Sequence, residues 1–112
     1  MNIDSHLIDD AVVIEISGKI MGGESATNFH SLIREHLNNK KRSFVIDLEK
    51  TIWTNSIGIG MLIAGHTAVM KESGSFVLCN ITNIQDLLSM TQLLKVFKVS
   101  DSRSEALSIS KA

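Results

Sequence analysis

Residues 54–60, which read Thr-Asn-Ser-Ile-Gly-Ile-Gly, combine a serine hydroxyl with two closely spaced glycines. An apolar helical pattern follows directly, and serine and asparagine are favoured helix N-caps because their side-chain oxygens accept the amide hydrogens of the first turn. Gly58 and Gly60 would lie in that turn, where each glycine costs roughly 1 kcal/mol relative to alanine. We therefore expect another element or a partner molecule to approach the bare backbone there.

Ser56 provides the hydroxyl of this segment. A phosphate on Ser56 would be stabilised at the helix N-terminus, whose free amides and dipole favour negative charge. The same group would add nearly two negative charges and considerable bulk to any interface formed by this segment. A phosphorylation switch is one interpretation and a simple N-cap at Ser56 is the other, and the residue pattern alone leaves both open.

The rest of the sequence offers Ser56 no catalytic partners. It contains neither a Gly-x-Ser-x-Gly elbow nor a Gly-x-x-x-x-Gly-Lys-(Ser/Thr) phosphate loop. No histidine or carboxylate falls in a segment that we could assign as its base and orienter. The four histidines lack metal-ligand spacing and are His6, His30, His36 and His66. We predict a protein that is not an enzyme and that holds no metal or cofactor.

Composition and charge argue against several other classes of protein. The 112 residues include eleven basic and twelve acidic side chains, for a formal net charge of -1, which argues against direct nucleic-acid binding. The N-terminal sequence lacks the basic start and apolar run of a secretory signal, and no apolar segment approaches the roughly 20 residues of a membrane span. We therefore expect a cytoplasmic protein without membrane insertion. Because proline is absent and the composition does not shift, we expect a single domain over residues 1–112, and we expect that domain to be monomeric.

Hydrophobic patterns predict strands and helices that alternate after an initial hairpin. The expected strands lie at residues 3–7, 11–17, 43–48, 75–79 and 95–99. The expected helices lie at residues 24–39, 57–72 and 83–91 and from Ser102 onward, where Ser-Arg-Ser-Glu forms a capping box. Asn83 is the expected N-cap of the third helix, and residues 49–53 are expected to cross the sheet edge as a connection. This order predicts an α/β fold with a mixed sheet of four to five strands flanked by about four helices.

Several large side chains near these elements are assigned to the core. Trp53 lies three residues before Ser56, where an aromatic side chain that closes the core under a loop is favoured over a partner contact. Cys79, the only cysteine, excludes an intrachain disulfide and is expected to act as a small buried apolar side chain. The remaining expected packing residues are Met61, Met70 and Met90.

Residues 55–79 resemble the central signature of STAS domains, the family of bacterial anti-sigma factor antagonists. The family signature is Asp-Ser-(Ser/Thr)-Gly-(Leu/Val)-Gly, and the serine after the aspartate is the phosphorylated residue. Here the signature reads Asn-Ser-Ile-Gly-Ile-Gly from Asn55 to Gly60, so the resemblance assigns the phosphoserine position to Ser56. Similarity to other family elements extends the resemblance over nearly the whole chain, at residues 12–20, 44–53 and 87–97.

Two positions depart from the family pattern. Asn55 replaces the usual acidic residue before the serine, which keeps the capping ability but removes a charge beside the phosphorylation site. Met21 replaces the aspartate that usually follows the family's Gly-x-(Leu/Ile) segment, and the connection from Met21 to Gly23 is one residue longer than usual. Both changes lie on the surface that a kinase would contact.

The resemblance implies a regulatory binding module. The unmodified protein would bind an anti-sigma factor with serine-kinase activity, phosphorylation of Ser56 would end the binding, and a serine phosphatase would reverse the modification. The implied partner-binding residues are Thr54, Asn55, Ser56, Ile57, Gly58, Ile59 and Gly60, together with Met21 and Gly22. The alternative is a non-phosphorylated structural or accessory STAS subunit of a stress-signalling scaffold or a membrane transporter.

Overall fold

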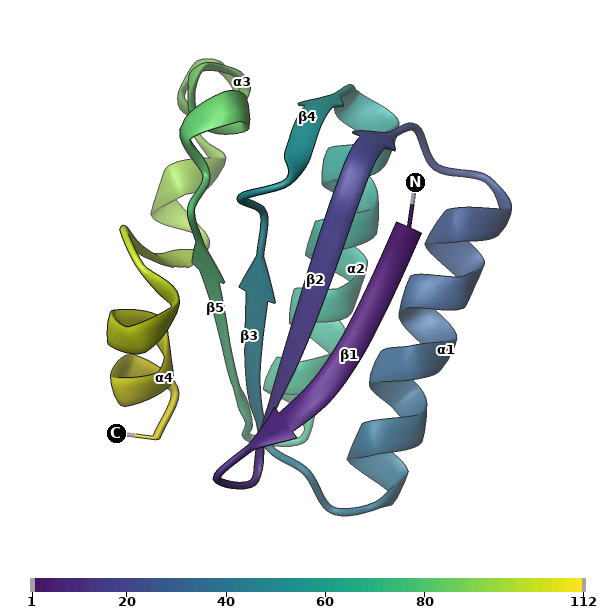
Figure 1. Ribbon diagram of the computed structural model, residues 1–112. Coiled ribbons are helices and arrows are strands. Elements are labelled where there is room, and N and C mark those ends of the chain that lie inside the picture. Colours follow the sequence, from purple (N-terminus) through teal and green to yellow (C-terminus); the bar gives the residue numbers. More distant parts are fainter. Residues whose placement is uncertain (1, 112) are drawn as a thin grey trace.

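The computed structural model describes residues 2–111, which form a mixed six-stranded sheet covered by helices (Figure 1). The strands are β1 (Asn2–Ile8), β2 (Ala11–Ile20), β3 (Ser43–Asp47), β4 (Thr51–Thr54), β5 (Ser75–Cys79) and β6 (Lys98–Ser100). Five of these strands follow the order β1-β2-β3-β5-β6, and β4 pairs with the last part of β2. β1 is antiparallel to β2, whereas the other pairs between these strands are parallel.

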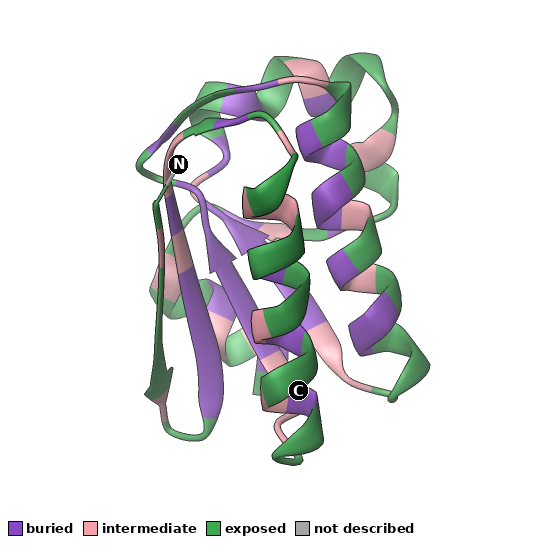
Figure 2. Ribbon diagram, turned by 90° about the vertical axis from the view of Figure 1, so that its right-hand side faces the viewer, coloured by how far each residue is buried: buried purple, intermediate pink, exposed green. Residues whose placement is uncertain are grey.

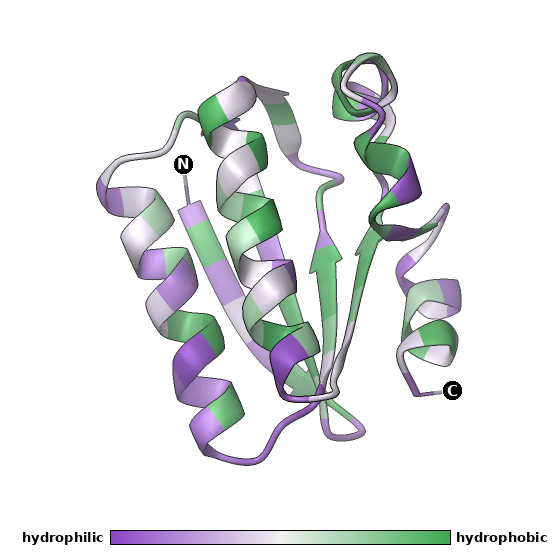
Figure 3. Ribbon diagram, turned by 180° about the vertical axis from the view of Figure 1, so that it is seen from behind, coloured by the Kyte–Doolittle hydropathy of each residue, from purple (hydrophilic) through white to green (hydrophobic). Residues whose placement is uncertain are grey.

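Helices cover both faces of the sheet. α1 (Glu24–Asn38) and α2 (Ser56–Lys71) pack side by side on one face, which Figure 3 shows from behind. α4 (Arg103–Lys111) packs on the other face, against β3 and β5. α3 (Gln85–Met90) lies between two short 3-10 helices, η1 (Thr82–Ile84) and η2 (Leu93–Lys95), in the connection from β5 to β6. The predicted α/β fold with four α-helices is confirmed.

The alternation of side chains along β2 assigns them to two cores. Val12, Ile14 and Ile16 are fully buried in the main core under α1 and α2, whereas Val13 belongs to a smaller cluster under α4. Burial on both faces explains why β3 and β5 are almost continuously apolar. Figure 2 shows the buried strands behind α1, whose outer side is exposed.

The segment before Ser56 forms a strand where we expected a connection. The hydroxyl of Thr51 donates to the carbonyl oxygen of Ile16 at 2.7 Å, and the hydroxyl of Thr54 donates to the carbonyl oxygen of Ile20 at 3.1 Å. These bonds help attach β4 to β2, so the sheet has six strands and not the four to five expected. β4 reads Thr-Ile-Trp-Thr and buries its two threonines, while Ile52 and Trp53 are exposed. Because this is the reverse of the usual burial pattern, apolar periodicity does not identify the strand from the sequence.

One strand boundary and one helix cap near the C-terminus also differ from expectation. The last strand begins at Lys98 and not at residue 95, because η2 occupies Leu93–Lys95. Asn83 does not cap α3, since its side-chain amide donates instead to the carbonyl oxygen of Thr51 at 2.9 Å. The expected cap of α4 is confirmed: the hydroxyl of Ser102 accepts the amide of Glu105 at 3.1 Å.

The expected packing residues divide into buried and exposed groups. Met61 and Cys79 are buried as expected, and burial is the main cause that raises the pKa of the Cys79 thiol to about 12. Met70 and Met90 are exposed, so their assignment to the core is wrong. Within residues 2–111, no helix has the length and apolarity needed to cross a membrane, and no cluster of acidic, histidine or cysteine side chains could hold a metal ion.

Candidate functional site

Ser56 is the first residue of α2 and lies exposed where β4 ends. Asn55 is the N-cap of this helix: its side-chain oxygen accepts the amide of Gly58 at 2.9 Å, and its carbonyl oxygen accepts the amide of Ile59 at 3.0 Å. The interpretation of Ser56 as the N-cap is therefore wrong, and its hydroxyl is not needed to start the helix. The two remaining first-turn amides belong to Ser56 and Ile57, so a phosphate on Ser56 would lie beside them.

The two glycines of the first turn have different environments. A Cβ atom added at Gly58 would lie 2.6 Å from the carbonyl oxygen of Ile20 and 2.1 Å from the hydroxyl oxygen of Thr54. Gly58 therefore allows α2 to pack against the end of β2. A Cβ atom added at Gly60 would have no neighbour within 4 Å. Intramolecular packing explains the first glycine, and the backbone at the second is open to a partner.

Three of the expected partner-contact residues are buried and cannot meet a partner directly. Thr54 and Ile59 are 5% and 2% exposed, and Gly58 is buried beneath the end of β2. Thr54 is attached to β2 by its hydroxyl, and Ile59 lies in the main core. These residues position the helix start, while contact is possible for the exposed residues around them.

The turn after β2 lies beside the start of α2. Ile20 and Thr54 are register partners, so the chain leaves the sheet at neighbouring points on the two strands. Gly22 has φ +90, and a Cβ atom there would lie 2.3 Å from Cγ2 of Ile57. A glycine is thus required at this position both by its conformation and by the close side chain. The structure thereby brings the expected residues Met21 and Gly22 next to the Ser56 segment.

The segments next to Ser56 carry exposed apolar side chains. Met21 is 57% exposed, Trp53 46% and Ile57 62%. The assignment of Trp53 to the core is wrong, because β4 lies at the end of the sheet and the indole is not covered. We refer to the accessible residues here as the Ser56 surface, which consists of Met21, Gly22, Trp53, Asn55, Ser56, Ile57 and Gly60.

The first four turns of α2 continue this surface without formal charge. No aspartate, glutamate, lysine or arginine occurs between Ser56 and Met70, although Gly60, Ala64 and Thr67 are exposed. Figure 3 shows most of α2 in white and green, whereas α1 beside it is largely purple. A helix face that is exposed yet uncharged is unusual for a solvated surface and is typical of an interaction surface.

Comparison with known proteins supports the resemblance seen in the signature. The sequence profile of the STAS domain matches residues 2–106. The chain belongs to the STAS domain family.

Solved structures share the fold of this STAS domain at low sequence identity. An anti-sigma factor antagonist from Mycobacterium paratuberculosis is 22% identical, with a TM-score of 0.81 over 99% of this chain and 94% of that one. The Bacillus cell fate determinant SpoIIAA in its phosphorylated form is 14% identical, with a TM-score of 0.73 over 96% and 97%. A sulfate transporter family protein from Wolinella succinogenes is also 14% identical, with a TM-score of 0.80 over 95% and 88%.

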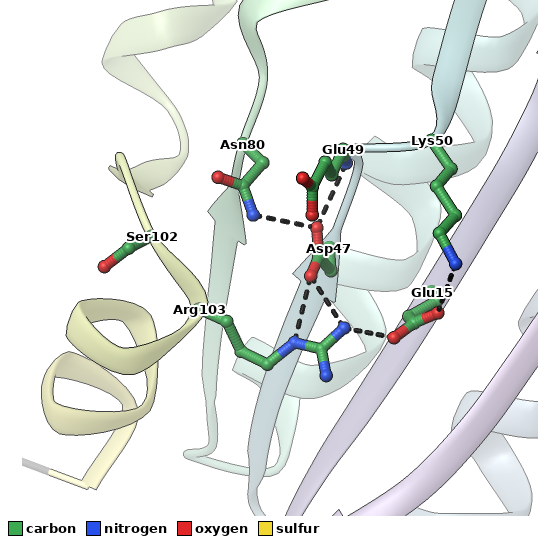
Figure 4. A pocket seen from close by; sticks show the side chains of 7 residues that line it. All are labelled: Glu15, Asp47, Glu49, Lys50, Asn80, Ser102 and Arg103. Atoms are coloured by element: carbon green, nitrogen blue, oxygen red, sulfur yellow. Dashed lines mark hydrogen bonds and ion pairs between the residues drawn. The ribbon is translucent and has the colours of Figure 1, made fainter.

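A polar pocket of about 380 Å³ opens on the face of this STAS domain that α4 covers in part (Figure 4). Its lining residues are Glu15, Asp47, Glu49, Lys50, Asn80, Ser102 and Arg103. Asp47 is buried at its centre and binds Asn80 and Arg103. The residue patterns of the sequence do not predict this pocket. Asp47 is the one residue whose type could have indicated it, because a charged residue within an apolar strand needs polar partners.

Asp47 makes the stability of this STAS domain dependent on pH. Burial alone raises its pKa, but hydrogen bonds from Asn80, from the amide of Glu49 and from Arg103 outweigh burial and lower the pKa below the ordinary value of 3.8. Folding therefore favours the ionised carboxylate, and this stabilisation is present above the ordinary pKa and is lost as the pH falls through the lowered one.

We expect the free energy of unfolding to decrease as the pH falls below about 4, in part through protonation of Asp47. Asp47→Asn should be less stable at neutral pH and should show a weaker dependence on pH in this acidic range. Urea denaturation at a series of pH values measures both quantities. Equal pH dependence in the wild type and the variant would contradict the prediction.

Proposed function

We propose that this protein is an anti-sigma factor antagonist that binds an anti-sigma factor with serine-kinase activity through the Ser56 surface. The partner would phosphorylate Ser56 with its own ATP, the modified protein would dissociate, and a serine phosphatase would restore it. The observation that supports this proposal most directly is an exposed, non-capping serine at a helix N-terminus among exposed apolar side chains. Residues 1–112 would act as a single, monomeric STAS domain in the cytoplasm, without catalytic activity of its own.

The unmodified surface suits an apolar partner. Met21, Trp53 and Ile57 expose side chains of the kind that dominate the centres of protein interfaces, where water is excluded. Gly60 allows the partner backbone to approach α2 closely. Met21 in place of the usual aspartate enlarges the apolar area, so its presence is compatible with binding.

Phosphorylation would change this surface at its centre. The phosphate adds nearly two negative charges, which the partner would have to desolvate among apolar groups. In the free protein the same phosphate is stabilised by the amides of Ser56 and Ile57 and by the dipole of α2. Asn55 assists this state because it caps the helix without placing a carboxylate beside the phosphate. The modification thus destabilises the complex and stabilises the free protein, and both effects favour dissociation.

The rival candidate is an accessory STAS subunit that is never phosphorylated, in a signalling scaffold or beside a transporter. Asn55 and Met21 favour it, because both remove acidic residues from the surface that a kinase would contact. The fold shared with a sulfate transporter family protein is compatible with this role.

A pull-down from the lysate of the source organism, analysed by mass spectrometry, distinguishes the two candidates. The baits are the wild type, Ser56→Asp and Ser104→Asp; the last variant places the same charge in the exposed first turn of α4. We expect the wild type and Ser104→Asp to capture an ATP-binding serine kinase, and Ser56→Asp to lose it by roughly tenfold or more. Equal recovery of scaffold or transporter subunits with all three baits would refute the proposal and support the rival.

A further inference from the structure

The polar pocket joins α4 to the segments that form the Ser56 surface. We propose that Arg103 of α4 is a positioning residue for the Ser56 surface. Its guanidinium holds β2 and the end of β3, and these two strands lead into the two halves of that surface. The biological meaning of this inference rests on the proposed function. Arg103 would influence the same partner-binding surface from the face of the sheet that α4 covers.

Arg103 binds two carboxylates on neighbouring strands (Figure 4). Its Nε donates to Oδ2 of Asp47 at 2.9 Å, and its Nη2 lies 2.8 Å from the same oxygen. Nη2 also donates to Glu15 on β2. The side chain of Asp47 is only 4% exposed, so removing the guanidinium leaves a buried carboxylate without its cation, which is a strongly unfavourable arrangement. We expect the end of β3 to rearrange when Arg103 is replaced.

Asp47 is connected to Ser56 through a short turn and β4. Oδ1 of Asp47 accepts the amide of Glu49 at 3.0 Å, and the carbonyl oxygen of Lys50 accepts the amide of Gly18 on β2 at 2.9 Å. β4 begins at the residue after Lys50, and a single capping residue separates its end from Ser56. A change at Asp47 is therefore transmitted along bonded backbone to the start of α2.

Glu15 provides the second connection. It lies on β2 in register with Asp47. The same strand pairs with β4 at Ile20, and the next residue is Met21 of the Ser56 surface. Both segments that form this surface are thus attached to one guanidinium, which explains why a single side chain of α4 can influence their relative position.

The contact is accessible, and α4 offers a matched control for it. The Arg103 side chain is 32% exposed and lines the solvent-open pocket, so solvent reaches the contact. At the other end of α4, Nζ of Lys111 lies 3.4 Å from Oδ2 of Asp9 in the turn between β1 and β2. Lys111 is thus also a cation of α4 with a carboxylate partner, but the route from Asp47 through β4 does not include it.

Amide hydrogen exchange on the full chain tests the proposal without any partner. The variants are Arg103→Gln, Arg103→Lys and the control Lys111→Gln. For Arg103→Gln we expect exchange roughly tenfold faster across residues 49–59, with β1 and α1 changed less than about twofold. Arg103→Lys, which keeps the charge but loses the two-sided contact, should give a smaller change in the same segment, and Lys111→Gln should give none there.

Wild-type exchange over residues 49–59 in Arg103→Gln would overturn the proposal, as would acceleration spread evenly over all strands. If Arg103→Gln does not fold, Arg103→Lys decides the question by the same comparison. The result does not depend on the proposed function. A protein whose residues 49–59 respond to Arg103 but which captures no kinase would retain the connection and lose only its regulatory meaning.

Discussion

Replacing Ile57 with aspartate is expected to weaken binding of the anti-sigma kinase roughly 30-fold or more, which corresponds to about 2 kcal/mol. Ile57 is 62% exposed, directly follows Ser56 and packs against the turn at Gly22. A carboxylate at this position would be desolvated by an apolar partner surface without a compensating charge. Isothermal titration calorimetry with the purified kinase measures the loss of affinity.

The domain itself should tolerate this substitution. An acidic side chain in the first turn of α2 interacts favourably with the helix dipole, and the position is open to solvent. Leu7→Asp is the matched control, because Leu7 is 50% exposed on β1 and pairs with Val12 at the opposite end of β2 from Met21. Unchanged affinity in Ile57→Asp, or an equal loss in both variants, would show that the partner binds elsewhere.

Gly58→Ala is expected to destabilise the fold by about 1–3 kcal/mol, whereas Gly60→Ala should stabilise it by up to about 1 kcal/mol. The added methyl group at Gly58 meets the carbonyl oxygen of Ile20 and the hydroxyl of Thr54, and the methyl group at Gly60 meets nothing. Helix propensity favours alanine equally at both positions, so the opposite signs isolate the packing of α2 on β2. Urea denaturation of the two variants measures the difference.

Gly60→Ala also tests the proposed interface. If a partner backbone approaches α2 at Gly60, the variant should bind the kinase more weakly even though its own fold is more stable. A variant that is stabilised and binds normally would leave Gly60 outside the contact area. Equal destabilisation by both alanine substitutions would contradict the difference in packing that we describe.

Regular periodicity explains why most of the fold could be predicted. The apolar positions of α1 repeat with a helical period, and β3 and β5 are continuous apolar runs, because these elements bury most of their surface. β4 is not predicted because it buries its two threonines, whose hydroxyls bond to β2, and exposes Ile52 and Trp53, so its apolar residues do not mark a buried strand face. The expectation that Met70, Met90 and Trp53 lie in the core fails because residue type alone does not decide burial, and folded proteins expose a large share of their apolar atoms. Of the three, only Trp53 belongs to the Ser56 surface.

The alternation of elements, the family and the serine at which a phosphorylation switch is proposed can be read from the amino-acid order alone, because these depend on residue types at short spacing. The three-dimensional fold was needed to show that Asn55 and not Ser56 caps α2, and that Gly58 serves packing while Gly60 remains open. The fold also places Arg103 against Asp47, a residue far from it in the sequence. The packing of Gly58 and the contact of Arg103 arise where separate segments meet, and local spacing does not specify how strands and helices pack. The cap is a local bond, but Asn55 takes that position because the pairing of β4 with β2 runs to Thr54 and leaves Asn55 as the residue before α2.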